Sequence, residues 1–297
     1  MEIKAVPCKS ALNKIKGDRL PFPWDLNIYR GCGHGCKYCY ALYSHDYLEE
    51  ENFYNTIYYK ENIVEVLRKE LQSPTWKKQV INFGGVTDSY QPLEKKIQLM
   101  PELLKLMIEF ENPITISTKS DLIVRDIDLI NELSQVTEVN IALTITCMDE
   151  KIRRVIEPGA TPSLQRFQAL NELSKTNASR GVHFMPIIPY LTDTDENLDE
   201  ILRFSRDIKV DYVLPGMLYL RGKTRKMFYQ FYEEYDAERC RRLKDILYNK
   251  DKKMVYRKEL YQRLHSYYKK YELRQYRGKQ LIKEMKRDYR QIELDIE

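Results

Sequence analysis

Short runs of β-branched and large apolar residues alternate with longer amphipathic stretches over roughly the first 220 residues of the chain. Six runs predict strands, because each ends near Gly, Pro or polar residues: DLNIYRG (25–31), QVINFGGV (79–86), PITISTK (113–119), VNIALTIT (139–146), GVHFMPIIP (181–189) and DYVLPGMLYL (211–220). The intervening stretches predict helices, several of them opened by proline or a capping residue: 60–72, 101–111, 127–135, 162–175 and 196–207.

Strands that alternate with helices favour parallel pairing through right-handed crossovers. Six βα units fall short of the eight of a full barrel. The predicted fold class is therefore α/β, a partial (β/α)6 TIM-type barrel with a basic C-terminal helical extension. A doubly wound parallel sheet is the alternative. In both architectures, ligands gather at the carboxyl ends of the strands.

The strand pattern stops near Arg221, where charged, tyrosine-rich helical sequence begins. From Tyr219 onward the chain has 23 Lys and Arg against 13 Asp and Glu, whereas the rest has 26 against 31. This asymmetry indicates that the two parts have different roles. We predict an N-terminal extension (1–25), a barrel (26–220) and a basic helical extension (221–297).

No run of about eighteen apolar residues occurs, and the amino-terminal sequence MEIKAVPCKS lacks the hydrophobic segment of a secretion signal. These features predict a cytoplasmic protein with no membrane partner. A reducing compartment disfavours disulfides, and Cys8, Cys147 and Cys240 are too scattered for a disulfide framework.

Three other cysteines lie close together in RGCGHGCKYCYA: Cys32, Cys36 and Cys39, spaced C-x3-C-x2-C. They follow the first predicted strand, so they belong on a loop at its carboxyl end. A structural zinc site needs four ligands, which His34 or His45 could complete. An iron–sulfur cubane on three cysteines instead leaves one iron open to another ligand. The spacing alone permits both.

This motif resembles the signature of the radical S-adenosylmethionine (radical SAM) enzymes, in which an aromatic residue precedes the last cysteine, as Tyr38 does here. The resemblance implies a 4Fe-4S cluster on Cys32, Cys36 and Cys39, with S-adenosylmethionine chelated by the open iron. It also implies reductive cleavage to a 5′-deoxyadenosyl radical, and a reductase or a flavodoxin- or ferredoxin-type electron donor. The family fold is a six-unit partial barrel.

The same resemblance implies cosubstrate-binding residues at other strand ends. Gly84 and Gly85 resemble the family's glycine motif, whose carbonyl groups receive the cosubstrate's amino group. Lys119 and Thr144 stand where related enzymes place a carboxylate partner and ribose hydrogen-bonding groups. Ordinary alternatives are a strand-to-loop turn, a solvated lysine and a strand-forming threonine. Tyr38 could equally serve in packing.

A narrower resemblance, to the spore photoproduct lyase-like group, covers most of the chain. The matching segments are LNIYRGCGHGCKYCYA, GGVTDSYQPLE, STKSDLIVRD, IEPGATPSLQR and MPIIPYLTD. The fourth, residues 156–166, resembles a distinctive lyase segment and makes Glu157 and Arg166 candidate site residues. The alternative for Glu157 is a surface carboxylate beside a Pro-Gly turn.

One position departs from the lyase pattern. The lyase has a hydrogen-donating cysteine after its second strand, where this chain has Gly85. Glycine has no thiol, so repair of the photoproduct would require Cys147 or a tyrosine such as Tyr90 as a substitute. The alternative for Cys147 is a buried structural cysteine.

The basic extension bears on the substrate. From Tyr219 onward the chain holds 12 of the 23 tyrosines, interleaved with Lys and Arg. Basic side chains neutralise phosphates and tyrosines stack on bases, so we expect a nucleic-acid or nucleotide substrate. Three alternatives stay open: helices that only pack on the barrel, a peptide or small-metabolite substrate, and a non-catalytic metal-binding module.

Overall fold

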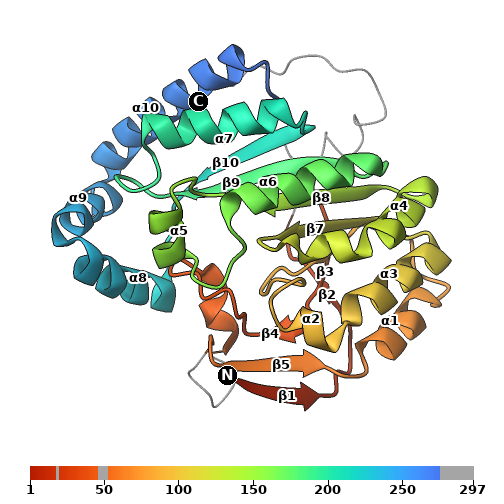
Figure 1. The fold of residues 1–297 in the computed structure, drawn as a ribbon. Helices are drawn as coiled ribbons and strands as arrows, with labels where there is room; N and C mark the ends of the chain where they lie inside the picture. The colour runs from red at the N-terminus through yellow and green to blue at the C-terminus, as the bar shows by residue number, and fades with distance from the viewer. Residues whose placement is uncertain (18–19, 46–52, 275–297) are drawn as a thin grey trace.

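A parallel sheet whose strand order follows the chain forms the centre of the molecule (Figure 1). The structure is a computed structural model that describes residues 1–17, 20–45 and 53–274. The six parallel strands are β3 (Trp24–Leu26), β6 (Ile81–Phe83), β7 (Ile114–Thr118), β8 (Val139–Thr144), β9 (Ser179–Ile187) and β10 (Tyr212–Met217). A doubly wound sheet reverses its strand order at a switch point. The sequential order here confirms the partial barrel instead.

Helices follow one another along the outer side of this sheet, as Figure 1 shows. The principal ones are α1 (Ile63–Leu71), α3 (Leu99–Phe110), α4 (Ile127–Val136), α6 (Ser163–Glu172) and α7 (Asp195–Asp207). Shorter elements lie between them: α2 (Glu94–Ile97), α5 (Glu150–Ile156), and the 3-10 helices η1 (Tyr40–His45), η2 (Asp121–Asp126) and η3 (Leu173–Lys175). Each predicted helix therefore has an observed counterpart.

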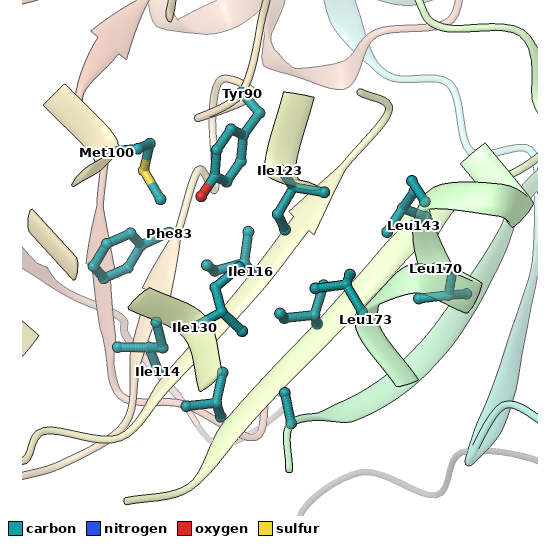
Figure 2. Close-up of a cluster of buried hydrophobic side chains, with 14 of the residues drawn as sticks. Phe83, Tyr90, Met100, Ile114, Ile116, Ile123, Ile130, Leu143, Leu170 and Leu173 are labelled. Carbon is teal, nitrogen blue, oxygen red and sulfur yellow. The ribbon is translucent and has the colours of Figure 1, made fainter. Parts of the chain in front are cut away.

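The hydrophobic core lies between the sheet and these helices. Ile114 and Ile116 of β7 point into it, and Leu143 of β8 joins them (Figure 2). Successive side chains of a strand point to opposite faces. The intervening residues of β7 to β10 therefore face the barrel interior, at whose rim the candidate site lies.

A second, three-stranded sheet was not predicted. β1 (Glu2–Val6) pairs in parallel with β5 (Thr56–Lys60), which pairs antiparallel with β4 (Tyr29–Arg30). The predicted strand 25–31 is thus divided between β3 in the barrel and β4 in this sheet. β2 (Leu12–Lys14) pairs antiparallel with β3 at the edge of the main sheet.

Three helices form the described part of the basic extension: α8 (Gly222–Tyr235), α9 (Ala237–Tyr248) and α10 (Lys250–Lys270). Residues 275–297 of the predicted extension lie outside the described residues. α10 runs along α7 (Figure 1), where Arg263 and Lys270 form ion pairs with Asp195 and Asp199 at 2.8 and 2.6 Å. None of the described helices combines the length and the apolar character needed to cross a membrane.

Tyr268 shows how closely α10 is attached to the barrel. Its side chain is 5% exposed, and its hydroxyl donates to the Val213 carbonyl of β10 at 2.9 Å. A ring buried in this way is not accessible for stacking on a base. The described end of α10 therefore packs on the barrel. This agrees, for α10, with the alternative that the helices of the extension pack on the barrel.

Candidate functional site

The three clustered cysteines lie on a buried loop at the carboxyl end of the first barrel strand. Cys32 and Cys36 are 8% and 7% exposed, and Cys39 is half-buried. Burial raises the pKa of all three thiols, that of Cys36 to about 12. Thiolates in this loop therefore need a positively charged partner to compensate for lost hydration.

His34, between the first two cysteines, is occupied at both ring nitrogens. Nδ1 lies 3.0 Å from the Gly159 carbonyl, and Nε2 lies 3.0 Å from Oδ2 of Asp88. His34 is thus a structural link between three segments and is not placed to complete a zinc site. His45 is also buried, with Nε2 3.4 Å from the Thr56 carbonyl. Among the described residues, no three His, Cys, Asp or Glu side chains are arranged to hold one metal ion.

Asp88 anchors this link to the strand ends. Besides His34, it accepts hydrogen bonds from Thr118 Oγ1 at 2.7 Å, Lys119 N at 2.8 Å and Tyr90 N at 2.9 Å. Burial alone would raise the pKa of Asp88, but His34 and these donors hold it at about 2. Asp88 is therefore an ionised carboxylate that fixes the loop to β7.

Two further residues of the GGVTDSYQPLE segment hold the cysteine loop. Gln91 accepts a hydrogen bond from Gly33 N at 2.9 Å and donates to the Gly31 carbonyl at 3.2 Å. Thr87 donates to the same carbonyl at 2.8 Å. Sequence reasoning did not single out Thr87, Asp88 or Gln91, although all three lie in a segment that carried the family resemblance.

The IEPGATPSLQR segment packs against the other side of the loop. Ile156 O accepts a hydrogen bond from Lys37 N at 2.9 Å, and Gly159 N donates to His34 O at 2.8 Å. A Cβ on Gly159 would lie 2.2 Å from the Gly33 carbonyl oxygen, so only glycine fits this approach. The segment is therefore a brace for the cysteine loop.

Glu157 and Arg166 form a fully buried ion pair at 2.5 Å behind the loop. Glu157 also accepts hydrogen bonds from Tyr38 and, at 2.9 Å, from Thr146, while Arg166 donates to the Thr144 carbonyl at 2.7 Å. Burial opposes ionisation of Glu157, but Arg166 and Lys119 hold its pKa at about 2. Both groups are committed to partners within the protein, so the contacts of Glu157 are those of a residue that positions Tyr38.

The other predicted cosubstrate-binding residues lie at strand ends on the same rim. Gly84 follows β6 with a φ of +94°, Lys119 follows β7, and Thr144 ends β8. Lys119 Nζ lies 5.7 Å from the centre of the Tyr38 ring. Burial by itself lowers the pKa of Lys119, but the larger combined effect of Cys36 and Glu157 is to raise it. The net pKa is above its ordinary value, so the ammonium stays charged beside the cysteine loop.

The two suggested substitutes for the lyase cysteine lie in different places. Cys147 is 1% exposed, packs in one apolar cluster with Cys36 and Tyr38, and donates to the Asp149 carbonyl at 3.5 Å. Burial raises its pKa to about 12. The structural alternative therefore accounts for Cys147, since the thiol is buried and neutral.

Tyr90 points away from the site. Its fully buried ring lies in the core with Phe83 and Met100 (Figure 2), and its hydroxyl donates to Asp126 at 3.1 Å. This position gives the phenol no route to the barrel interior. The structure thus lends no support to Tyr90 as a hydrogen donor.

The first turn of α8 meets the cysteine loop. Thr224 Oγ1 donates to the Cys39 carbonyl at 2.8 Å, and Phe228 and Tyr232 share an apolar cluster with Cys36. The extension thus contributes a wall of the site. Sequence reasoning missed Thr224, because nothing in the local sequence links it to a loop 185 residues earlier.

Comparison with known proteins agrees with this arrangement. The family model of the radical SAM superfamily matches residues 26–205. An uncharacterised protein of Mycobacterium bovis is 35% identical over 227 residues, covering 75% of this chain and 67% of that protein. One from Methanocaldococcus jannaschii is 30% identical over 207 residues, covering 69% and 75%. A barrel with a three-cysteine loop at its rim defines the class, and the chain belongs to the radical SAM superfamily.

Solved structures share the fold at low sequence identity. A point mutant of spore photoproduct lyase matches with a TM-score of 0.62 at 13% identity, over 91% of this chain and 79% of that one. A double mutant of the lyase with bound AdoMet and dinucleoside spore photoproduct matches with a TM-score of 0.57 at 14% identity. This match covers 78% of the present chain and 66% of the lyase chain.

Proposed function

We propose that this protein is a radical SAM enzyme that carries a 4Fe-4S cluster on Cys32, Cys36 and Cys39. The observation that carries the proposal is the buried three-thiol loop whose nearest histidine, His34, is held by other groups. A cubane takes one thiolate at each of three irons, which fits this donor set. When bound, the cluster would supply the electron that cleaves S-adenosylmethionine to methionine and a 5′-deoxyadenosyl radical.

The chain's own residues would bind and orient the cosubstrate. Lys119 presents a charged ammonium beside the cysteine loop, suited to the cosubstrate's carboxylate. Carbonyl groups of the Gly84–Gly85 turn would accept hydrogen bonds from its amino group. Thr144 stands at the next strand end, where the ribose would lie. Glu157 and Arg166 would keep Tyr38 and the loop in place.

The substrate we propose is a nucleic acid or a nucleotide. Tyr219, directly after β10, is 66% exposed, and Arg221 and Lys226 are exposed on the first turns of α8. Because Thr224 contacts the cysteine loop, the start of α8, where these cations lie, is next to the site. Cations neutralise phosphates and an exposed aromatic ring stacks on a base. The bound dinucleoside in a lyase of the same fold favours this substrate class.

Two accompanying proposals concern the setting of the reaction. A base attacked by a radical has to leave its stack to reach the cluster, so a single-stranded or locally opened substrate is expected. The electron would come from a reductase or a flavodoxin- or ferredoxin-type protein. A reducing cytoplasmic location is consistent with unpaired cysteines.

Anaerobic reconstitution tests the proposal. Reconstituted protein should contain about four irons, show the EPR signal of a reduced cubane, and release 5′-deoxyadenosine and methionine in the presence of dithionite. The Cys36→Ala variant should lose both signal and products, because two thiolates do not retain a stable cubane. Cys8→Ser is the control, since Cys8 follows β1 and is not part of the cysteine loop. Full cleavage by Cys36→Ala protein would disprove the assignment.

A further inference from the structure

The interior side of the barrel is polar and in contact with solvent. Five side chains that alternate with the buried outward-facing residues keep solvent-accessible surface: Ser117, Lys119, His183, Met185 and Leu214. Barrels of the TIM type usually fill their interior with branched apolar residues. Serine, lysine and histidine on this inner wall instead present polar groups that a ligand below the cysteine loop could contact.

Tyr212 of β10 closes this interior from below. Its ring lies over Gly181 of β9, where an added Cβ would be 2.1 Å from the ring. Its hydroxyl donates to Asn140 Oδ1 at 3.2 Å and accepts from Asn140 Nδ2 at 3.0 Å. Asn140 Nδ2 also lies 3.0 Å from Thr115 Oγ1. The floor is therefore a hydrogen-bonded layer, and a ligand that displaced it would have to break these bonds.

His183 stands between this floor and Lys119. Its Nδ1 lies 3.0 Å from Ser117 Oγ, and its ring centre lies 6.2 Å from that of Tyr212. β8 separates β7 from β9, and its residue opposite Ser117 is Ala142. The small alanine side chain lets the Ser117–His183 bond pass over β8. The imidazole is thus fixed on the inner wall.

The imidazole is neutral and has one nitrogen to offer. Burial, and then the charge of Lys119, lowers the pKa of His183 to about 4, so it is uncharged near neutral pH. Ser117 occupies Nδ1, and the described residues provide no hydrogen bond to Nε2. Ser117 holds Nδ1, so Nε2 of the neutral ring is left to donate or accept one hydrogen bond in a fixed direction.

We propose that His183 is a specificity-determining residue, whose Nε2 hydrogen-bonds the uncharged polar edge of a nucleobase in the barrel interior between Tyr212 and Lys119. Ser117 is a positioning residue that orients the ring. The choice of a base rests on the proposed nucleic-acid or nucleotide substrate. A neutral imidazole suits an uncharged amide-like edge, whereas a phosphate would gain no counter-charge from His183, and Lys119 is already assigned to the cosubstrate's carboxylate.

The test is calorimetric titration of reconstituted protein, with S-adenosylmethionine bound, against the dinucleotide dTpdT and its analogue without bases. His183→Leu should weaken dTpdT binding by about tenfold, because the base edge loses its partner. His183→Gln keeps a donor and an acceptor on a flexible side chain and should restore much of the affinity. Ser117→Ala should weaken binding less and shift the ring-nitrogen signals of His183 in the 15N NMR spectrum, because Nδ1 loses its partner.

His265→Leu, on α10 and away from the interior, is the matched control and should bind dTpdT as the wild type does. Iron content and circular dichroism establish that each variant is folded. Unchanged affinity in His183→Leu, equal binding of the analogue without bases, or no dTpdT binding by the wild type would each overturn the inference. Failure of the proposed function is separate, since it appears as absent cosubstrate cleavage by the wild type.

Discussion

Asp25 occupies the space that any side chain at position 85 would need. A Cβ on Gly85 would lie 2.2 Å from Asp25 Oδ2. The carboxylate is held there by Asn27 Nδ2 at 2.6 Å, Asn82 Nδ2 at 2.7 Å and Gly85 N at 3.0 Å. Glycine at this position is therefore matched to a buried carboxylate on the neighbouring strand. Any larger residue at position 85 therefore requires Asp25 to move or to be replaced as well.

The wild-type protein should not repair the spore photoproduct efficiently, because Gly85 offers no thiol hydrogen. Gly85→Cys alone should not create the activity, since the new side chain would collide with Asp25. Asp25→Gly combined with Gly85→Cys removes the collision and is the informative variant. Conversion of the photoproduct back to two unlinked thymine nucleotides, measured beside a cysteine-containing lyase, decides the matter. Wild-type repair at the lyase's rate would contradict the prediction.

Arg166→Met should destabilise the protein by about 3–5 kcal/mol, because it leaves Glu157 buried without its cation. Adding Glu157→Gln should recover part of this loss, since no buried charge then remains. Urea unfolding monitored by fluorescence measures both effects. Arg68→Met, which removes an exposed pair with Glu109, is the control and should have little effect. If Arg166→Met and Arg68→Met lower the free energy of unfolding equally, the buried pair has no special stabilising role.

Acid should weaken the same pair. The pKa of Glu157 falls from its ordinary value of 4.5 to about 2 in the folded protein. A depressed pKa means that the pair's full contribution is present above about pH 4.5 and is lost as the pH falls toward 2. The stability difference between wild type and Arg166→Met/Glu157→Gln should therefore shrink as the pH falls from about 4.5 toward 2. Urea midpoints at several pH values test this, and a constant difference would exclude it.

Binding of single-stranded DNA should depend on the exposed cations at the start of α8. Log affinity should fall with log salt by about 0.7 per neutralised phosphate. Replacing Arg221 and Lys226 together by Gln should flatten that slope. The same change at Lys78 and Lys175, which precede β6 and β9 at the opposite rim, should not. Absence of binding, or an unchanged slope in the first variant, would favour a peptide or small-metabolite substrate.

The sequence was sufficient for the barrel strands and the cysteine loop, because both rest on local patterns. Strand periodicity located all six parallel strands, and C-x3-C-x2-C spacing marked the loop. It did not predict β1 and β5, since they pair with each other across a long stretch of the chain. Residues 25–31 read as one strand, and only the tertiary structure divides them between two sheets.

Side-chain partners were harder to predict than elements. Net charge indicated a basic extension, but it could not show that Arg263 and Lys270 pair with acidic residues of α7. A lone His183 in an apolar strand reads as a core residue, and its inward direction follows only from the barrel. Glu157 was predicted as a site residue on resemblance, while its complete burial depends on Arg166 and Tyr38.

The hydrogen bonds around the cysteine loop also constrain the order of biosynthesis. His34 needs the Gly159 carbonyl, and Cys39 needs the Thr224 hydroxyl, which emerges from the ribosome 185 residues later. A nascent chain that has not yet reached Gly159 already contains all three cysteines but neither of these contacts. The loop therefore takes its final shape only after Thr224 has been synthesised, and iron and sulfide would be delivered to a finished loop only from that point on.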